Sequence, residues 1–281
     1  MRTLLLAAIL AVAGPAALCA QPDPWAAVRV PTAGPPQVLG SYAAGCLAGA
    51  VALPARGRGY QVLRPQRNRF YGHPATIAFV RRLAAEAAQR SLGIVLVADM
   101  AQPRGGPMPA GHGSHQIGLD VDIWLRLPKA PLSAAQLADP REGSMGAGRQ
   151  GDRRVWGPAQ ARLIRLAAEA PGIDRIFVNP AIKAELCRSA GSDRAWLEKV
   201  RPWWGHDEHF HVRLRCPPGQ TGCVPQKPVP PGDGCGWEVR SWLRQAAVVI
   251  PSNRPNSRHP VLPAACEAVL EQPTVMAAGG R

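Results

Sequence analysis

A short segment, residues 111–124, concentrates side chains that can bind a metal ion. It contains His112 and His115, followed by Asp120 and Asp122, so that two imidazoles and two carboxylates fall within eleven positions. From position 118 onward apolar and polar residues alternate, which predicts a strand whose two carboxylates leave the face opposite the core. We therefore expect these carboxylates to line a cleft.

A second segment, residues 205–214, adds three histidines. It ends in another alternating pattern, in which His209 and His211 share one face of a strand and apolar residues occupy the other. The two segments together hold five of the seven histidines in the chain. Neutral imidazole and carboxylate are ligands that zinc accepts, and a catalytic zinc keeps three protein ligands and one open position. The pattern therefore predicts a zinc site.

These residues resemble the signature of a known family. His115 and Asp122 form a His-x6-Asp motif and His209 and His211 form His-x-His; further similar stretches are Asn179-Pro180, Arg201-Pro-Trp and residues 212–217. The chain is similar to the penicillin-insensitive murein endopeptidases, which share their metal centre with lysostaphin-type and D-Ala-D-Ala metallopeptidases. The similarity covers roughly residues 40–270 and is more specific than a single metal motif.

The resemblance implies a role for each candidate metal ligand. His115, Asp122 and His211 match the three core ligands of the family, and His112 matches an additional ligand. His112 could instead support another ligand or contact substrate. Asp120 has no place in the His-x6-Asp motif although it shares the face of Asp122, and we expect it to orient a ligand imidazole.

The remaining two histidines of these segments are candidates for catalysis. His209 lies two residues from His211, about 6–7 Å along a strand, which suits a base that acts on water activated by zinc. We expect His206 to assist His209 or to bind substrate; the alternative is an ordinary surface histidine. A serine nucleophile fits less well, because Ser114 lacks a Gly-x-Ser-x-Gly turn.

The resemblance also implies the activity. It predicts a zinc metallo-endopeptidase that hydrolyses the peptide cross-links of peptidoglycan between D-alanine and diaminopimelate. The alternative from another class is a non-catalytic cell-wall-binding protein that keeps a structural zinc. An endopeptidase would release muropeptides from the cell wall, whereas a wall-binding protein would not.

The first twenty residues predict export. Arg2 precedes an apolar run and then the small residues Cys19 and Ala20, which is the layout of a secretory signal peptide. Its removal would leave the mature chain in the periplasm, and no later stretch reaches the ~18 apolar residues of a membrane span. We expect residues 21–281 to form a single murein endopeptidase domain with a proline-rich C-terminal tail.

The charge of the chain limits the choice of partners. With 33 Lys and Arg against 19 Asp and Glu, the formal net charge is +14, which favours anionic partners. The basic residues are scattered and form no run that could follow phosphates, so nucleic acid is disfavoured. Export favours an acidic cell-wall polymer, namely peptidoglycan, and a generally basic composition without a dedicated partner is the alternative.

The cysteines predict a disulfide framework. Seven become six once Cys19 leaves with the signal peptide, and an even number in an exported chain is typical of disulfides, although many pairings are open. A zinc site built from cysteines is disfavoured because no two are spaced as Cys-x2-4-Cys. The family resemblance implies the pairs Cys46 with Cys266, Cys187 with Cys235, and Cys216 with Cys223.

Several further elements must position the two motif strands. Helical spacing follows Pro74, with His73 as a cap or surface residue, and recurs over residues 158–170. Residues 173–178 are expected to form a strand. Asn179 then caps a helix that begins with the next residue, a proline.

The whole pattern predicts an α+β fold. We expect a central antiparallel sheet that brings residues 120–122 and 209–211 to one cleft, helices on the opposite face, and long loops tied by disulfides. Residues 21–58 are expected to form an extended arm. Residues 237–250 are expected to form the last helix.

Overall fold

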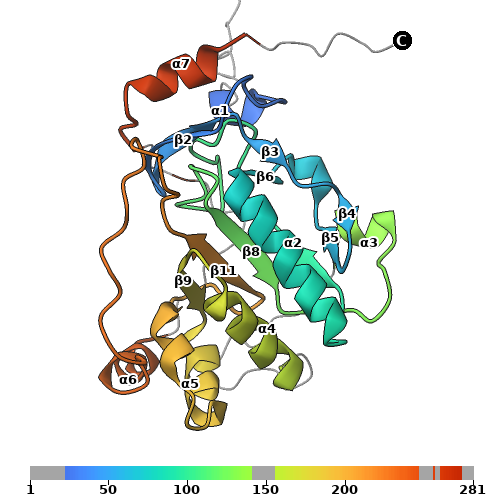
Figure 1. Cartoon of the computed structure of the whole chain (residues 1–281), viewed down its shortest axis with the longest axis vertical. Coiled ribbons are helices and arrows are strands. Elements are labelled where there is room, and N and C mark those ends of the chain that lie inside the picture. Colours follow the sequence, from blue (N-terminus) through green and yellow to red (C-terminus); the bar gives the residue numbers. More distant parts are fainter. Residues whose placement is uncertain (1–22, 141–155, 247–255, 257–259, 274–281) are drawn as a thin grey trace, which may run out of the picture.

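The molecule is built around one mixed sheet of seven strands (Figure 1). The computed structural model describes residues 23–140, 156–246, 256 and 260–273, so the expected signal peptide lies outside the described residues. From one edge to the other the strands are β10 (Val200–Pro202), β9 (Ile173–Val178), β11 (His209–Leu214), β8 (Asp120–Trp124), β7 (Val95–Val97), β5 (Tyr60–Val62) and β4 (Arg56–Gly57).

The centre of this sheet is antiparallel, as the sequence predicted. Strands β9, β11, β8 and β7 pair antiparallel in that order. Beside them lie two parallel pairs, β10 with β9 and β5 with β7. Parallel neighbours need a crossover connection, and helices α5 (Pro180–Ser189) and α2 (Pro74–Gln89) lie in these two connections. The α+β fold class is confirmed, with parallel pairs added on both sides of the antiparallel centre.

Helices α2 and α4 (Pro158–Glu169) pack on the sheet through a shared apolar core (Figure 1). His73 and Asn179 cap α2 and α5 as predicted, each accepting a hydrogen bond from a first-turn N–H at 3.1 and 2.9 Å. Buried side chains such as Phe79 of α2 and Leu163 of α4 belong to the same core as Val121 of β8. Because side chains alternate along a strand, the polar residues of β8 leave the opposite face. In the described ranges, no helix is both long and apolar enough to cross a bilayer.

The N-terminal region is more ordered than the expected extended arm, and that prediction is wrong for residues 37–48, which form a hairpin. Its strands are short and contain glycine, so no strong local pattern announces them; tertiary packing fixes them instead. At Gly45, for example, an added Cβ would lie 2.5 Å from Cγ2 of Ile117. The elements of this region are α1 (Pro24–Ala27), β1 (Gln37–Ser41), β2 (Ala44–Ala48), and β3 (Val51–Ala52), which pairs with β6 (Tyr71–Gly72).

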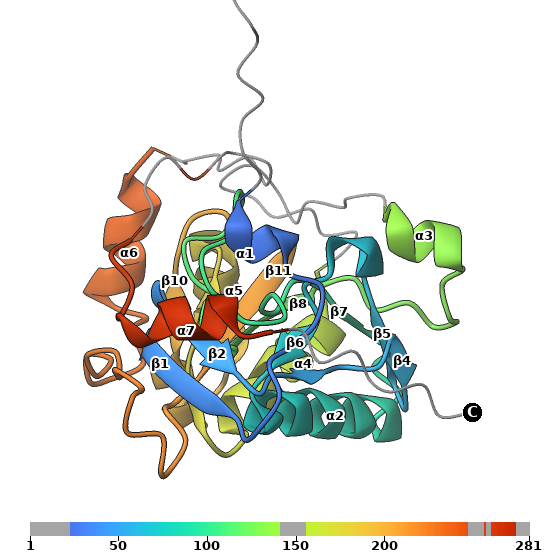
Figure 2. The ribbon, with the colours of Figure 1, turned by 90° about the horizontal axis from the view of Figure 1, so that it is seen from above.

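The C-terminal segment is tied to the domain by disulfides. The three pairs implied by the resemblance are confirmed: Cys46–Cys266, Cys187–Cys235 and Cys216–Cys223. The helix expected over residues 237–250 is α6 (Trp237–Arg244), which ends earlier and is not the last, because α7 (Ala265–Glu271) follows. Residues 247–250 lie outside the described ranges. Figure 2 shows α7 lying across the β1–β2 hairpin, to which the first disulfide joins it.

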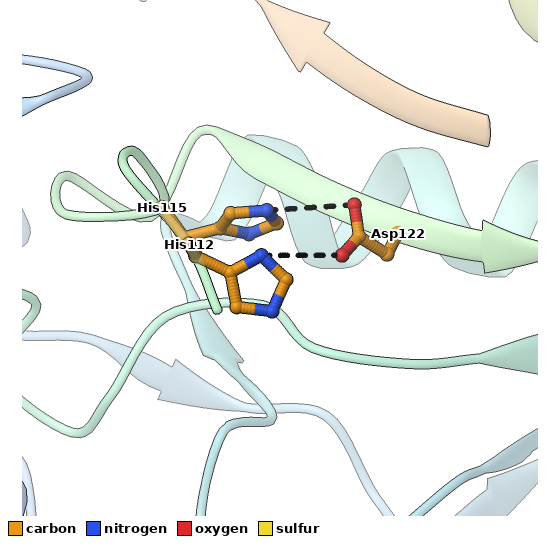
Figure 3. A group of neighbouring side chains, drawn as sticks. All are labelled: His112, His115 and Asp122. Carbon is orange, nitrogen blue, oxygen red and sulfur yellow. Dashed lines mark ion pairs between the residues drawn. The ribbon is translucent and has the colours of Figure 1, made fainter. Parts of the chain in front are cut away.

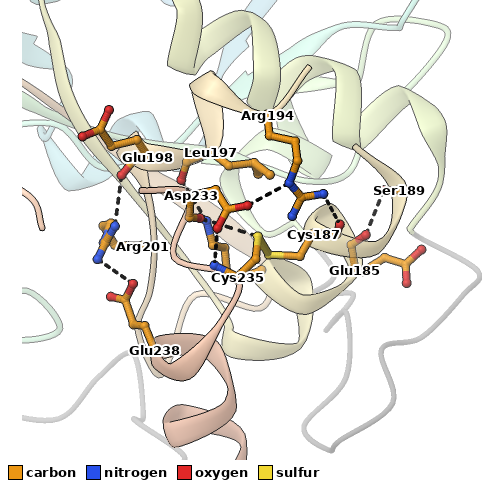
Figure 4. The surroundings of a disulfide bond; sticks show 11 residues. Glu185, Cys187, Ser189, Arg194, Leu197, Glu198, Arg201, Asp233, Cys235 and Glu238 are labelled. Atoms are coloured by element: carbon orange, nitrogen blue, oxygen red, sulfur yellow. Dashed lines mark hydrogen bonds and ion pairs between the residues drawn. A yellow bond between two sulfur atoms is a disulfide. The ribbon is translucent and has the colours of Figure 1, made fainter. Parts of the chain in front are cut away.

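Helix α6 packs against α5, and two charged pairs tie it and the loop before it to neighbouring parts of the fold (Figure 4). Nε of Arg194, just before η2 (Ala195–Lys199), lies 2.8 Å from Oδ2 of Asp233. Nη2 of Arg201 in β10 lies 2.5 Å from Oε2 of Glu238 in α6. The disulfide between Cys187 of α5 and Cys235 joins the segment just before α6 to α5. Helix α6 is therefore held in place by a covalent bond as well as by charged pairs.

Lys183 of α5 is buried beneath this arrangement and makes stability depend on pH. Its Nζ donates to the carbonyl oxygens of Leu197 and Asp233 at 2.8 and 2.5 Å. Burial, and next the charge of Arg201, lower the pKa of Lys183 to about 7, although Glu238 and Asp233 act in the opposite direction. In the unfolded chain a lysine pKa is ~10.4. Between these values the unfolded chain binds the proton and the folded chain does not, so the free energy of unfolding should rise with pH.

Urea unfolding between about pH 7.5 and about pH 9.5 tests this prediction. We expect Lys183→Met to be less stable than the parent protein and to lose the part of the upward pH slope that Lys183 contributes. Lys227→Met, at an exposed position, is the matched control and should keep the slope. Equal slopes in the parent protein and Lys183→Met would contradict the prediction.

Candidate metal centre

Strands β8 and β11 bring the two motifs together. They pair antiparallel with His211 opposite Asp122 and Arg213 opposite Asp120. Residues directly opposite on one face of an antiparallel pair are in contact distance, so the register itself places an imidazole against a carboxylate. The apolar residues between them belong to the main core, as the two alternating patterns predicted.

Asp122 is the residue on which the histidines converge (Figure 3). Nε2 of His115 lies 3.4 Å from its Oδ1, and Nδ1 of His112 lies 3.7 Å from its Oδ2. One ligand atom from each of the three residues lies within 4.8 Å of the others. His115 has a φ of 68°, a left-handed conformation that is uncommon outside glycine, and its backbone N–H donates to Oδ2 of Asp120 at 3.0 Å. The loop is therefore held in the conformation that turns this imidazole toward Asp122.

Strand β11 and the loop before it add three more imidazoles. Nδ1 of His211 lies 3.3 Å from Oδ1 of Asp122, and Nε2 of His209 lies 3.6 Å from Oδ2. The ring of His206 is centred 5.2 Å from that of His209 and 5.9 Å from that of His211. The structure therefore gathers all six predicted site residues into one cluster, and His206 packs within it.

The cluster contains buried polar atoms that lack partners. Both ring nitrogens of His115 and Oδ1 of Asp122 have no hydrogen bond among the residues that the structure describes. Nε2 of His115 lies 3.4 Å from Oδ1 of Asp122, which is an ion-pair distance without hydrogen-bond alignment. Burying such atoms unpaired costs free energy. A cation between the imidazoles and the carboxylate would satisfy them, and this donor set fits zinc.

Protonation states follow from burial and from neighbouring charges. Burial lowers the pKa of His115 to about 4, so its imidazole is neutral and can donate lone pairs. Burial raises the pKa of Asp122, but His209 and His115 outweigh burial and hold it well below its usual value. For His211, burial lowers the pKa, yet Asp120 and Asp122 outweigh burial and raise it to about 9. A metal ion at Nδ1 of His211 must therefore displace a proton.

Most of the sequence matches one family of proteins. The family model described as "Penicillin-insensitive murein endopeptidase" matches residues 38–271. The chain belongs to the penicillin-insensitive murein endopeptidase family. A protein of that name from Yersinia enterocolitica is 48% identical over 251 residues, which cover 88% of this chain and 90% of the relative. Proteins of the same name from Klebsiella pneumoniae and Salmonella paratyphi B are 45% and 46% identical, covering 95% and 89% of this chain and 96% and 91% of theirs. The family predicted from the sequence motifs is confirmed.

In this penicillin-insensitive murein endopeptidase family member, Asp120 has the contacts of a residue that orients a ligand. Its Oδ1 lies 3.0 Å from Nε2 of His211, an ion-pair distance without hydrogen-bond alignment, and this is the ring nitrogen that faces away from Asp122. Arg213 fixes the carboxylate by donating from Nε and Nη2 to its two oxygens at 2.8 and 3.1 Å. These contacts support the proposal that Asp120 directs Nδ1 of His211 toward the metal.

Replacing Asp120 with asparagine should weaken metal binding without removing a ligand. The amide keeps the shape of the side chain but removes the charge that fixes His211, and we expect metal affinity to fall about 10–100-fold. Competition with a chelating dye measures this affinity. Glu169→Gln, at an exposed carboxylate of α4, is the control and should bind as the parent protein does. Unchanged affinity in Asp120→Asn would show that Asp120 does not act through the metal.

Asp99 is a residue of the site that the sequence did not reveal. It follows β7, is buried, and accepts at Oδ2 from Nε2 of His112 at 2.9 Å. The other ring nitrogen of His112 faces Asp122. Asp99 therefore contacts the outer ring nitrogen of His112, as Asp120 contacts that of His211, and at His112 this contact is a hydrogen bond. The only local signal was a carboxylate placed directly after a buried apolar strand.

Phe177 of β9 is a second such residue. Its ring packs against those of His211 and His206, with centroids 5.4 and 6.0 Å apart. Its neighbours Ile176 and Val178 belong to the core, so Phe177 projects from the polar face of the sheet. The only hint in the sequence was an aromatic residue at a polar-face position of an alternating strand. In the structure this ring gives the histidine cluster an apolar wall.

Proposed function

We propose that the protein is a zinc-dependent murein endopeptidase that hydrolyses the D-alanyl-diaminopimelate cross-links of peptidoglycan in the periplasm, after loss of a signal peptide. The observation that carries this proposal is the convergence of His112, His115 and His211 on Asp122 in a member of the penicillin-insensitive murein endopeptidase family. The names of the relatives support murein as the substrate. The net charge of +14 suits an acidic polymer.

Four residues would hold the zinc ion: His112, His115, Asp122 and His211. Three imidazoles with one carboxylate are a donor set that zinc accepts, and zinc can expand to five positions, so a fourth protein ligand would still leave room for water or substrate. Asp99 and Asp120 each contact the ring nitrogen that faces away from Asp122, in His112 and His211 respectively, which holds the other nitrogen toward the metal. When bound, zinc supplies Lewis acidity toward the scissile carbonyl and toward water.

His209 is the proposed catalytic base. Burial lowers its pKa, which keeps the ring neutral and leaves a nitrogen able to accept a proton from the attacking water. Its Nε2 lies 3.6 Å from Asp122, whose negative charge stabilises the ring once it is protonated. The same nitrogen can then give the proton to the departing amine of diaminopimelate.

His206 is proposed to assist. Its Nδ1 lies 3.0 Å from the carbonyl oxygen of Trp204, and a carbonyl accepts, so Nδ1 is the donor and Nε2 is left as the acceptor. Burial, followed by the charges of His209 and His211, lowers its pKa well below the usual value. A neutral His206 beside His209 can position the attacking water or a polar group of the substrate.

Incubation of the purified protein with cross-linked muropeptides tests the proposal. We expect monomeric muropeptides to be released, the reaction to stop with a chelator, and activity to return with zinc. Penicillin should not inhibit, because a β-lactam traps a serine nucleophile and none is used here. Binding to sacculi without release of monomers, with zinc retained, would instead support a non-catalytic wall-binding protein.

A further inference from the structure

Two arginines lie beside the metal cluster and share one carboxylate. Nη1 of Arg67 and Nη1 of Arg69 lie 3.3 and 2.9 Å from Oδ2 of Asp99. The same oxygen is 2.9 Å from Nε2 of His112. The arginines are therefore separated from Asp122 by two side chains in contact, Asp99 and His112. The carboxylate that they share follows β7, whereas Phe177 lies in β9, on the far side of β8 and β11 in the strand order.

The turn that carries Arg67 is held in place on both sides. It is the short 3₁₀ helix η1 (Pro65–Arg67), and the residues before and after it, Arg64 and Asn68, have φ of 49° and 55°. Left-handed backbone costs free energy at a residue such as arginine, and it persists only where surrounding contacts determine it. Here the N–H of Arg64 donates to Leu137 of α3 (Ala134–Ala138) at 2.8 Å, and Asn68 donates to Val28 at 3.4 Å. The backbone that carries Arg67 is thus preorganised.

Among the residues that the structure describes, the charges of this cluster do not balance. Two guanidinium groups face one buried carboxylate, and the side chain of Arg67 is 36% exposed, against 14% for Arg69 and 6% for Asp99. Burial lowers the pKa of Arg67, Asp99 opposes this, and the neighbouring charges of Arg64 and Arg69 lower it further. A second anion at the exposed side of Arg67 would reduce this repulsion and gain charge-assisted hydrogen bonds.

We propose that Arg67, supported by Arg69, binds a carboxylate of the cross-link peptide on the amine side of the bond to be cut. This inference rests on the proposed function and adds a substrate-recognition residue to it. Diaminopimelate has two amines and two carboxyl groups; once one of each is used in the stem peptide and the other amine is in the cross-link, one carboxylate remains beside the scissile nitrogen. A terminal D-alanine offers the same chemistry. Arginine suits either, because its planar guanidinium matches a carboxylate.

Selective amidation of the substrate tests the subsite. KM and kcat are measured on three cross-linked muropeptides: one unmodified, one amidated at the free diaminopimelate carboxylate, and one amidated at the terminal D-alanine. In the parent protein we expect one of the two amidations to raise KM roughly tenfold, and this identifies the carboxylate. Arg67→Gln should raise KM by the same factor on the unmodified substrate and show no further increase on amidation. Its kcat and its zinc content should match the parent protein.

Arg81→Gln removes an equal charge from the exposed face of α2 and should behave as the parent protein does. The subsite is overturned if neither amidation changes KM in the parent protein, or if Arg67→Gln stays as sensitive to amidation as the parent; in both cases the proposed hydrolysis stands. A fall in kcat with loss of zinc in Arg67→Gln would overturn it too, since Arg67 would then support His112. A parent protein that cleaves none of the three substrates removes the proposed function and this inference together.

Discussion

Purified His211→Ala should contain little zinc and release no more muropeptide than the chelated parent protein. His211 contributes the only proposed ligand from β11, and its Nδ1 lies 3.3 Å from Oδ1 of Asp122. Its removal leaves only the three proposed ligands of β8 and the loop before it. Asp120 also loses the imidazole that lies 3.0 Å from its Oδ1. Loss of a ligand weakens zinc binding directly, so metal content and activity should fall together. Metal analysis by mass spectrometry and muropeptide release measure both.

The control for this substitution is His73→Ala, which removes a histidine whose side chain caps α2 by accepting from the N–H of Ala75. It should cost stability but leave the zinc content unchanged. Full zinc occupancy in His211→Ala would show that His211 is not a ligand. Activity in that variant at the level of the parent protein would place the active site elsewhere in the molecule.

His209→Ala should give the opposite combination, with zinc retained and activity lost. The side chain reaches Asp122 from the same strand, at 3.6 Å from Oδ2, but in the proposed mechanism it moves a proton instead of binding the metal. Removal of a general base typically costs about 10²–10⁴ in rate, and we expect a fall of that size in kcat. Zinc content, measured as for His211→Ala, should equal that of the parent protein.

A metal-free His209→Ala together with a fully loaded His211→Ala would reverse the two assignments. If His209→Ala kept both zinc and activity, the base would be another group, and His206, centred 5.2 Å from His209, would be the next candidate. His206→Ala measured in parallel distinguishes these outcomes.

The sequence predicted the centre of the site because side-chain direction in a strand is a local property. Alternation alone placed Asp120 and Asp122 on one face of β8 and His209 and His211 on one face of β11. The family motifs then linked the two strands, and the structure places His211 directly opposite Asp122.

What the sequence did not predict depends on strand order and on tertiary contacts. Asp99 reaches His112 because β7 lies next to β8 in the sheet, and nothing in the residues around Asp99 encodes that neighbour. The β1–β2 hairpin was missed for a related reason, since its glycines are required by close packing, as at Gly45 against Ile117. Helix α7 is only seven residues long, which is too short for a strong helical pattern in the sequence, and a disulfide positions it.

The first disulfide has a consequence for the order in which the protein matures. Cys46 and Cys266 are 220 residues apart, and both other pairs, Cys187–Cys235 and Cys216–Cys223, lie between them in the chain. During synthesis from the N-terminus, Cys46 meets four non-native thiols before its own partner exists. An oxidant acting on the growing chain would therefore favour mispaired forms, which only thiol–disulfide exchange can correct. The yield of native protein should thus depend on a disulfide isomerase, and not only on an oxidant.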